Sequence, residues 1–164
     1  MNKHPLNIVI RAQDLKRWHT VNTIRPQTLA DHHWAVLVIA LDILDQTGIG
    51  GDYPTKLELV ERCIYHDVDE VYKGDTPAPR KDSDNAGAGF CPPFKDEIWA
   101  ILKVADAMEA YNWIRHNCAG EYTENIVVEN CRQRYHRRVK QAADQFFGSS
   151  FFVAAGSVLI SLNP

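Results

Sequence analysis

Apolar and polar positions alternate along most of the chain with the 3.6-residue period of an α-helix. From Trp34 onward one segment is apolar on nearly every side, so we expect a central buried helix there, ended by the glycines that follow residue 47. No segment shows a strong strand pattern. The sequence therefore predicts an all-α fold, a helical bundle with helices over residues 8–18, 29–46, 55–66, 98–117 and 121–147.

Two stretches lack this helical pattern. Residues 75–93 are rich in proline, glycine and charge, which predicts a long irregular loop, and such a loop in a compact domain is either mobile or functional. Residues 151–162 are apolar, and the pattern leaves open whether they form a last helix, a strand or a tail that faces a partner.

Length, composition and charge narrow the class of protein. A chain of 164 residues with 45% hydrophobic and 24% charged residues is typical of a single globular domain, which we place at residues 1–164. The formal net charge of −3 argues against binding of long nucleic acid, although local cations could hold a small anionic substrate. We find no signal peptide, membrane span or CxxC pair, so we expect no membrane association and a reducing cytoplasm.

The residues that can carry chemistry are His32, the adjacent pair His66 and Asp67, and Asp106. Each lies on or at the end of a predicted helix, and imidazole nitrogen and carboxylate oxygen together suit divalent transition metals. If the three helices pack as one bundle, their inward faces can place the four side chains around one point. A metal bound there would lower the pKa of a water molecule.

Simpler interpretations exist for each of these residues. A histidine in a helix is usually a surface residue or a satisfied core residue, and His33 could replace its neighbour His32 as a ligand. Asp106 alone would be a surface carboxylate more often than not, but it follows apolar residues on its helix, and a buried carboxylate needs a partner. The arginines at 132, 134, 137 and 138 indicate either a solvated helix face, which is the commoner case, or a patch that faces phosphate.

The order of these residues resembles that of the HD-domain phosphohydrolase superfamily and, more closely, the bacterial 5′-deoxynucleotidases of the YfbR type. The run HDxxE at 66–70, followed by GDxPxP at 74–79, is the specific part, because several motif positions recur in order. The sequence RWHT at 17–20 and the short length are also similar to phage-encoded dATP triphosphohydrolases of the DatZ type. The matching stretches between residues 14 and 112 are 17–18, 30–32, 65–71, 74–79 and 103–107.

This resemblance implies one HD domain with a long active-site loop and a single metal site. His32, His66, Asp67 and Asp106 would ligate one divalent transition metal, which is zinc, cobalt or manganese in this family. A second cation, magnesium, would accompany a polyphosphate substrate. The implied location is the cytoplasm of a bacterium or of a phage-infected host.

The resemblance also implies catalytic and substrate-binding residues. Glu70 and Asp75 would be catalytic, with Glu70 one helical turn beyond Asp67 as the general acid/base. Arg17 would bind phosphate through its planar fork, and Trp18 would contact the sugar or the base. Without the resemblance, Glu70 would be a solvated carboxylate and Trp18 a core residue. The remaining substrate-binding residues implied are Asp75, Thr76, Pro77, Ala78 and Lys81.

The expected activity is hydrolysis of the 5′ phosphoester of 2′-deoxynucleotides to give the deoxynucleoside. The phage resemblance favours the adenine series, dATP, dADP and dAMP. One alternative is a bacterial-type enzyme restricted to monophosphates, and another is a non-catalytic nucleotide-binding scaffold, against which Glu70 and Asp75 argue. The expected partners are a small deoxynucleotide and further copies of the chain, as a dimer or a hexamer, with residues 151–162 suited to the subunit contact.

Overall fold

The computed structural model describes residues 6–49, 52–74, 93–119 and 123–162. Within these ranges the chain is almost entirely helical, with one antiparallel pair of two-residue strands, β1 and β2. The all-α prediction is therefore confirmed. The elements in chain order are α1 (Leu6–Ile10), the 3₁₀ helix η1 (Arg11–Gln13), β1 (Lys16–Arg17), β2 (Gln27–Thr28), α2 (Leu29–Thr47), α3 (Tyr53–Tyr65), α4 (Glu70–Lys73), α6 (Glu97–Asn117), α7 (Thr123–Ala142), the π-helix η2 (Ala143–Phe147) and α8 (Ser150–Ser161).

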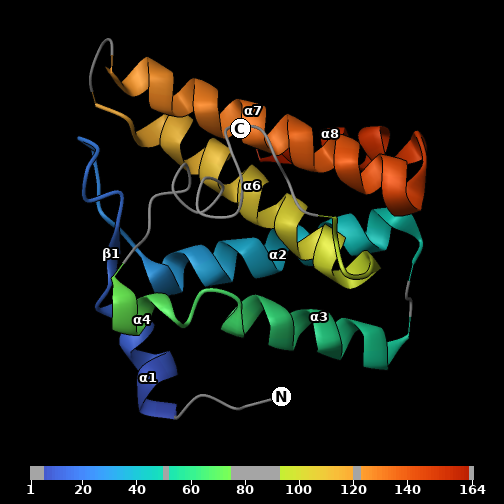
Figure 1. Ribbon diagram of the computed structural model, residues 1–164, viewed down its shortest axis with the longest axis horizontal. Helices are drawn as coiled ribbons and strands as arrows, with labels where there is room; N and C mark the ends of the chain where they lie inside the picture. The colour runs from blue at the N-terminus through green and yellow to red at the C-terminus, as the bar shows by residue number, and fades with distance from the viewer. Residues whose placement is uncertain (1–5, 50–51, 75–92, 120–122, 163–164) are drawn as a thin grey trace.

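Helix α2 is the centre of the molecule, as its apolar sequence predicts. It contacts α3 on one side and α6 and α8 on the others, and α7 packs along α6 (Figure 1). Both ends of α2 carry strong capping signals. Thr28 and Asp31 form a capping box at the start, and Gly48 at the end adopts the left-handed conformation, with φ 67°, that favours glycine.

The core is formed by the facing sides of α2, α6, α7 and α8. Buried aliphatic residues such as Ile43, Leu44 and Met108 dominate it, and a second, smaller cluster surrounds Trp113 and Ile114 at the other end of α6. Arg62 of α3 is tied to the first turn of α6, because it donates to both oxygens of the Asp96 carboxylate, the N-cap of α6, at 2.7 and 2.9 Å. These contacts fix α2, α3 and α6 against one another, which the site requires.

The prediction of one helix over residues 8–18 is wrong in its second half. The helix ends with η1, and the chain then pairs Lys16 with Thr28 and Arg17 with Gln27 in a short antiparallel ladder. Pairing with a segment eleven residues later overrides the local helical pattern. This ladder brings Arg17 next to the first turn of α2.

The apolar segment at residues 151–162 is resolved in favour of a helix. Phe151, Ala154, Ala155 and Val158 of α8 are buried against the core, whereas its opposite face is exposed. Of the loop predicted at residues 75–93, residues 75–92 lie outside the described residues. None of the described helices has the length and hydrophobicity needed to span a membrane.

Candidate metal and nucleotide site

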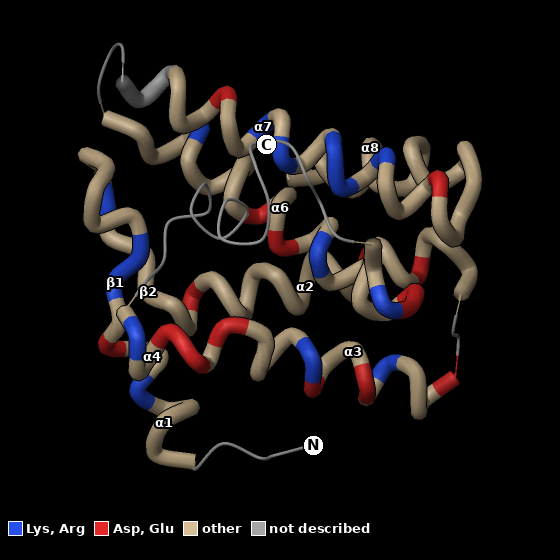
Figure 2. Tube along the Cα trace, viewed as in Figure 1, with Lys and Arg blue, Asp and Glu red and all other residues tan. Residues whose placement is uncertain are grey.

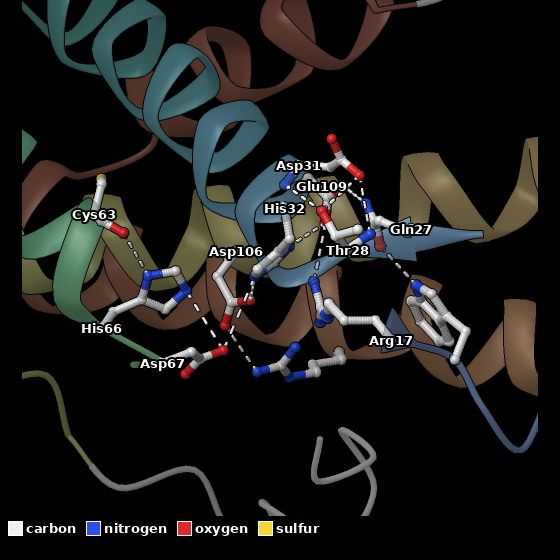
Figure 3. Close-up of polar contacts among 12 residues, drawn as sticks. Arg17, Gln27, Thr28, Asp31, His32, Cys63, His66, Asp67, Asp106 and Glu109 are labelled. Carbon is white, nitrogen blue, oxygen red and sulfur yellow. Dashed lines mark hydrogen bonds and ion pairs between the residues drawn. The ribbon is translucent and has the colours of Figure 1, made fainter. Parts of the chain in front are cut away.

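Four potential metal ligands meet where α2, α6 and the turn after α3 approach one another (Figure 3). His32 comes from α2, His66 and Asp67 from the turn, and Asp106 from α6, and one ligand atom of each lies within 4.8 Å of the others. Every one of these side chains is at most 9% exposed. Segments far apart in the sequence deliver them, so their convergence is a property of the fold.

Helix α2 presents His32 from its first turn, immediately after the capping box. The ring uses its two nitrogens differently. Nδ1 lies 2.5 Å from Oε2 of Glu109, whereas Nε2 lies 3.4 Å from Oδ1 of Asp106 and 3.9 Å from Oδ2 of Asp67. Nε2 is therefore the nitrogen that faces the other three potential ligands.

His66 is the C-cap residue of α3, and a main-chain group orients its ring. Nδ1 lies 2.8 Å from the Cys63 carbonyl oxygen, which can only accept a hydrogen bond, so Nδ1 carries the proton. Nε2 then presents its lone pair, 3.5 Å from Oδ2 of Asp67. Burial lowers the pKa of His66 to about 4, so the imidazole is neutral near pH 7, as a metal ligand must be.

Asp106 is held as a carboxylate by cations on α6 and α7. Nη2 of Arg134 donates to its Oδ2 at 3.1 Å, and Nζ of Lys103 lies 3.8 Å from the same oxygen. Burial acts to raise the pKa of Asp106, but Arg134, Lys103 and His32 outweigh it and hold that pKa well below the usual value. The interpretation of the arginines of α7 as a solvated face is wrong for Arg134 and Arg138, which are both buried.

The residues present fit a divalent cation. Nε2 of His32 and Nε2 of His66 are buried, and neither has a hydrogen-bond partner within the described ranges. Buried polar atoms are nearly always paired, so two unpaired nitrogens facing the same point indicate a missing partner. Two imidazole nitrogens and two carboxylates form a donor set that zinc accepts, and the carboxylates offset its charge.

His33, the alternative to His32, is not part of this group. Its ring lies 4.9 Å from that of His66 and 5.9 Å from that of His32, and it is buried beside them. Burial and the neighbouring His66 lower the pKa of His33 to about 2. It therefore lines the site as a neutral imidazole.

Sequence reasoning missed Glu109 and Gln27. Glu109 lies one helical turn after Asp106, is 3% exposed, and accepts from His32 and, at 2.6 Å, from Nε2 of Gln27. Oε1 of Gln27 in turn accepts from the indole Nε1 of Trp18 at 2.8 Å. The spacing of three from Asp106 is the one sequence signal that could have identified Glu109 as facing the site.

Arg17 and Trp18, the residues expected to contact the substrate, lie beside Glu109, Gln27 and Trp113. Nη1 of Arg17 is 3.6 Å from Oε2 of Glu109, and its side chain is 8% exposed. Trp18 has φ 60°, a backbone conformation that is uncommon for a bulky residue, and its ring stacks on Trp113 at 5.8 Å. A ring held by a stacking partner and a hydrogen bond is a rigid wall for a flat or apolar ligand.

Glu70 begins α4, one turn beyond Asp67, and its backbone N–H donates to the Asp67 carbonyl at 2.9 Å. Its side chain is buried, so the alternative interpretation as a solvated carboxylate is wrong. The other residues expected at the substrate, Asp75, Thr76, Pro77, Ala78 and Lys81, lie outside the described residues.

Acidic and basic residues lie on different elements around the site (Figure 2). Acidic residues gather at the start of α2, around α4 and on α6, while basic residues lie on β1 beside them. A carboxylate cluster next to exposed and half-buried cations can hold a cation and a phosphate together.

Comparison with known proteins gives a consistent family. Residues 4–147 match the model of the family described as 5′-deoxynucleotidase YfbR-like. A dATP triphosphohydrolase of Salmonella phage PMBT28 is 29% identical, over 82% of this chain and 78% of that protein. A dATP triphosphohydrolase of Acinetobacter phage SH-Ab 15497 is 26% identical, over 100% of this chain and 94% of that protein.

The fold is shared with a solved structure. The HD phosphohydrolase DatZ of Cyanophage S-2L, bound to dA and one catalytic Zn²⁺ ion, superposes with a TM-score of 0.71 and 21% sequence identity. The match covers 98% of this chain and 99% of that one, so the two proteins share one fold.

Proposed function

The chain belongs to the YfbR-like 5′-deoxynucleotidase family, and from this premise we propose that it is a metal-dependent phosphohydrolase that cleaves the 5′ phosphoester of dATP. The observation that carries the proposal is the convergence of His32, His66, Asp67 and Asp106 within 4.8 Å, with two buried imidazole nitrogens lacking a partner in the described chain. The adenine deoxynucleotide and the zinc ion are proposed because the relatives are named as dATP triphosphohydrolases and the structural neighbour holds dA and Zn²⁺.

The four ligands would hold the cation, which supplies Lewis-acid activation of water and of the phosphoryl oxygen. The chain's own residues do the rest. Arg17 contacts the phosphate and offsets the charge that develops there. Glu70, buried one turn from Asp67, takes the proton of the attacking water and returns it to the 5′ oxygen as the P–O5′ bond breaks. The products are deoxyadenosine and triphosphate.

Trp18 supplies the wall of the nucleoside pocket. Its fixed ring, stacked on Trp113 and hydrogen-bonded to Gln27, can cover an adenine face without a further cost in side-chain entropy. The arrangement orients the substrate so that its 5′ oxygen meets the catalytic groups. Asp75, Thr76, Pro77, Ala78 and Lys81, which the resemblance implies as further substrate contacts, lie outside the described residues.

The test is a product analysis with purified protein. Zinc-loaded protein is incubated with dATP, dADP, dAMP, dGTP and ATP, with and without magnesium, and the products are separated by chromatography. We expect deoxyadenosine and triphosphate from dATP, and no release by H66A. If wild type and H66A both release nothing from every deoxynucleotide, the proposed function is wrong.

Two alternatives have distinct outcomes in the same assay. Release from dAMP alone indicates a 5′-deoxynucleotidase restricted to monophosphates. Tight nucleotide binding without turnover indicates a binding scaffold. The buried Glu70, the proposed general acid/base, argues against that role. The dimer or hexamer implied by the resemblance stays a prediction, which light scattering after size exclusion would test.

A further inference from the structure

Glu109 is a buried carboxylate outside the ligand group, yet it contacts three parts of the site. Its Oε2 lies 2.5 Å from Nδ1 of His32 and 3.6 Å from Nη1 of Arg17, and its Oε1 accepts from Nε2 of Gln27 at 2.6 Å (Figure 3). The side chain is 3% exposed, so water does not satisfy it. A carboxylate buried this deeply is stable only when hydrogen-bond donors surround it, and His32, Arg17 and Gln27 are all donors here.

The contact with His32 decides which ring nitrogen is available. A carboxylate accepts, so Nδ1 must carry the hydrogen, and in the neutral ring Nε2 has its lone pair toward Asp67 and Asp106. Metal-binding histidines commonly donate their second nitrogen to a carboxylate, which fixes the ring and increases the basicity of the ligating nitrogen.

We propose that Glu109 is the positioning residue of this site: it holds His32 in the tautomer that can ligate through Nε2 and, through Gln27, joins the metal ligand to the Trp18 wall. The inference rests on the proposed metal site. Through the sequence Trp18–Gln27–Glu109–His32, each hydrogen bond at 2.8 Å or less, the nucleoside wall and the ligand are held in one rigid frame.

The isosteric replacement Glu109→Gln tests this directly. A glutamine has one acceptor oxygen where glutamate has two, so it cannot accept from both His32 and Gln27. Either its amide N–H faces the N–H of Gln27, or it faces Nδ1 of His32. In the first case His32 keeps its tautomer but loses the carboxylate that increases the basicity of Nε2. In the second case Nδ1 becomes the acceptor, the proton moves to Nε2, and that nitrogen can no longer ligate.

The measurement is zinc affinity in the absence of nucleotide, by competition with a chromogenic chelator, on folded protein checked by circular dichroism. Removal of a partner behind a ligand lowers metal affinity by about 10- to 100-fold, and we expect this for E109Q. The matched control is E97Q, which removes the same charge from an exposed position on the same helix and leaves affinity unchanged. Equal affinity of E109Q and wild type overturns the proposal.

A second variant separates the two arms of Glu109. Gln27→Met removes the connection to Trp18 and keeps the contact with His32, so we expect nearly wild-type zinc affinity and a raised KM for dATP. If Q27M weakens zinc as much as E109Q does, the tautomer explanation is wrong. Since zinc affinity needs no substrate, absence of dATP hydrolysis would refute the proposed function and leave this result standing.

The wild-type protein provides a test that does not depend on the folding of a variant. In zinc-loaded protein, long-range proton–nitrogen correlation of the imidazoles, with His32 assigned by its loss in H32N, reports the state of each ring nitrogen. We expect Nδ1 of His32 protonated and Nε2 bound to zinc. Any other state of the ring overturns the proposal.

Discussion

The two imidazoles of the site are oriented by different kinds of partner. Behind His32 stands the buried carboxylate of Glu109, at 2.5 Å from Nδ1, whereas behind His66 stands the main-chain carbonyl of Cys63, at 2.8 Å. Both partners select the same tautomer and direct Nε2 inward. The difference is that one is a charged side chain on another helix and the other is backbone within the same helix.

Because of this difference, the pKa values of the two rings are shifted in opposite directions. Burial and Arg17 act to lower the pKa of His32, but Glu109 and Asp106 outweigh them, and the pKa is raised. Burial dominates at His66, where the carbonyl adds no charge, and the pKa falls to about 4. A carboxylate partner thus makes His32 the more basic of the two imidazoles.

The largest effect is expected from removing the rings themselves. H32A and H66A should each abolish dATP hydrolysis, because either change takes one of four ligands. In metal-free protein, H32A should be less stable than H66A by about 1 to 3 kcal/mol, since it leaves the buried Glu109 carboxylate without its closest donor. Urea unfolding in the presence of a chelator measures the difference.

The substitution His32→Asn provides the control for that difference. The amide of asparagine can donate toward Glu109 in place of Nδ1, so H32N should recover part of the stability and none of the turnover. Equal stability of H32A and H66A would show that the carboxylate and carbonyl partners are energetically equivalent. That result would contradict the difference proposed between the partners of His32 and His66.

The second largest effect is expected in the pH dependence of stability, to which His66 and His32 contribute differently. His66 has a folded pKa of about 4 against about 6.5 in the unfolded chain, so the unfolded state binds more protons between these values. Metal-free protein must therefore lose stability as the pH falls from 6.5 to 4, by about 2 to 4 kcal/mol from this residue. H66N should make that part of the stability curve shallower.

His32 contributes with the opposite sign. Its folded pKa is raised, so its contribution is fully present below pH 6.5 and is lost as the pH rises through the folded value. H32N should therefore remove a loss of stability above pH 6.5 and leave the decline below pH 6.5 in place, whereas H66N makes the decline below pH 6.5 shallower. Parallel curves for the two variants, measured by urea unfolding at a series of pH values, would contradict the assignment of partners.

The partners of His32 and His66 also differ in how far the sequence predicts them. Helical spacing indicates α2, α3 and α6, and the order of His32, His66, Asp67 and Asp106 indicates their convergence. The partner of His66 follows from the local geometry of one helix end. The partner of His32 does not, because a glutamate is solvated by default and becomes buried here only through donors delivered by other elements.

Long-range pairing explains the remaining misses. The strand β1 exists because Gln27 and Thr28 lie opposite it, and the helical pattern of residues 8–18 contains no sign of that partner. Arg134 likewise sits in a run of arginines typical of a solvated face, and only the packing of α7 on α6 shows that it reaches Asp106. In both cases tertiary contact decides between two locally acceptable structures.

The smallest effect is expected at Cys63, and it sharpens the contrast because the partner of His66 is backbone. C63A removes the thiol and keeps the carbonyl, so zinc affinity should stay at the wild-type value while stability falls by about 1 kcal/mol from lost packing. Burial raises the pKa of the Cys63 thiol to about 12, so iodoacetamide at pH 8 should leave it unlabelled, as peptide mass spectrometry would show. If C63A instead lost zinc as E109Q is expected to, the sulfur and not the carbonyl would be supporting His66.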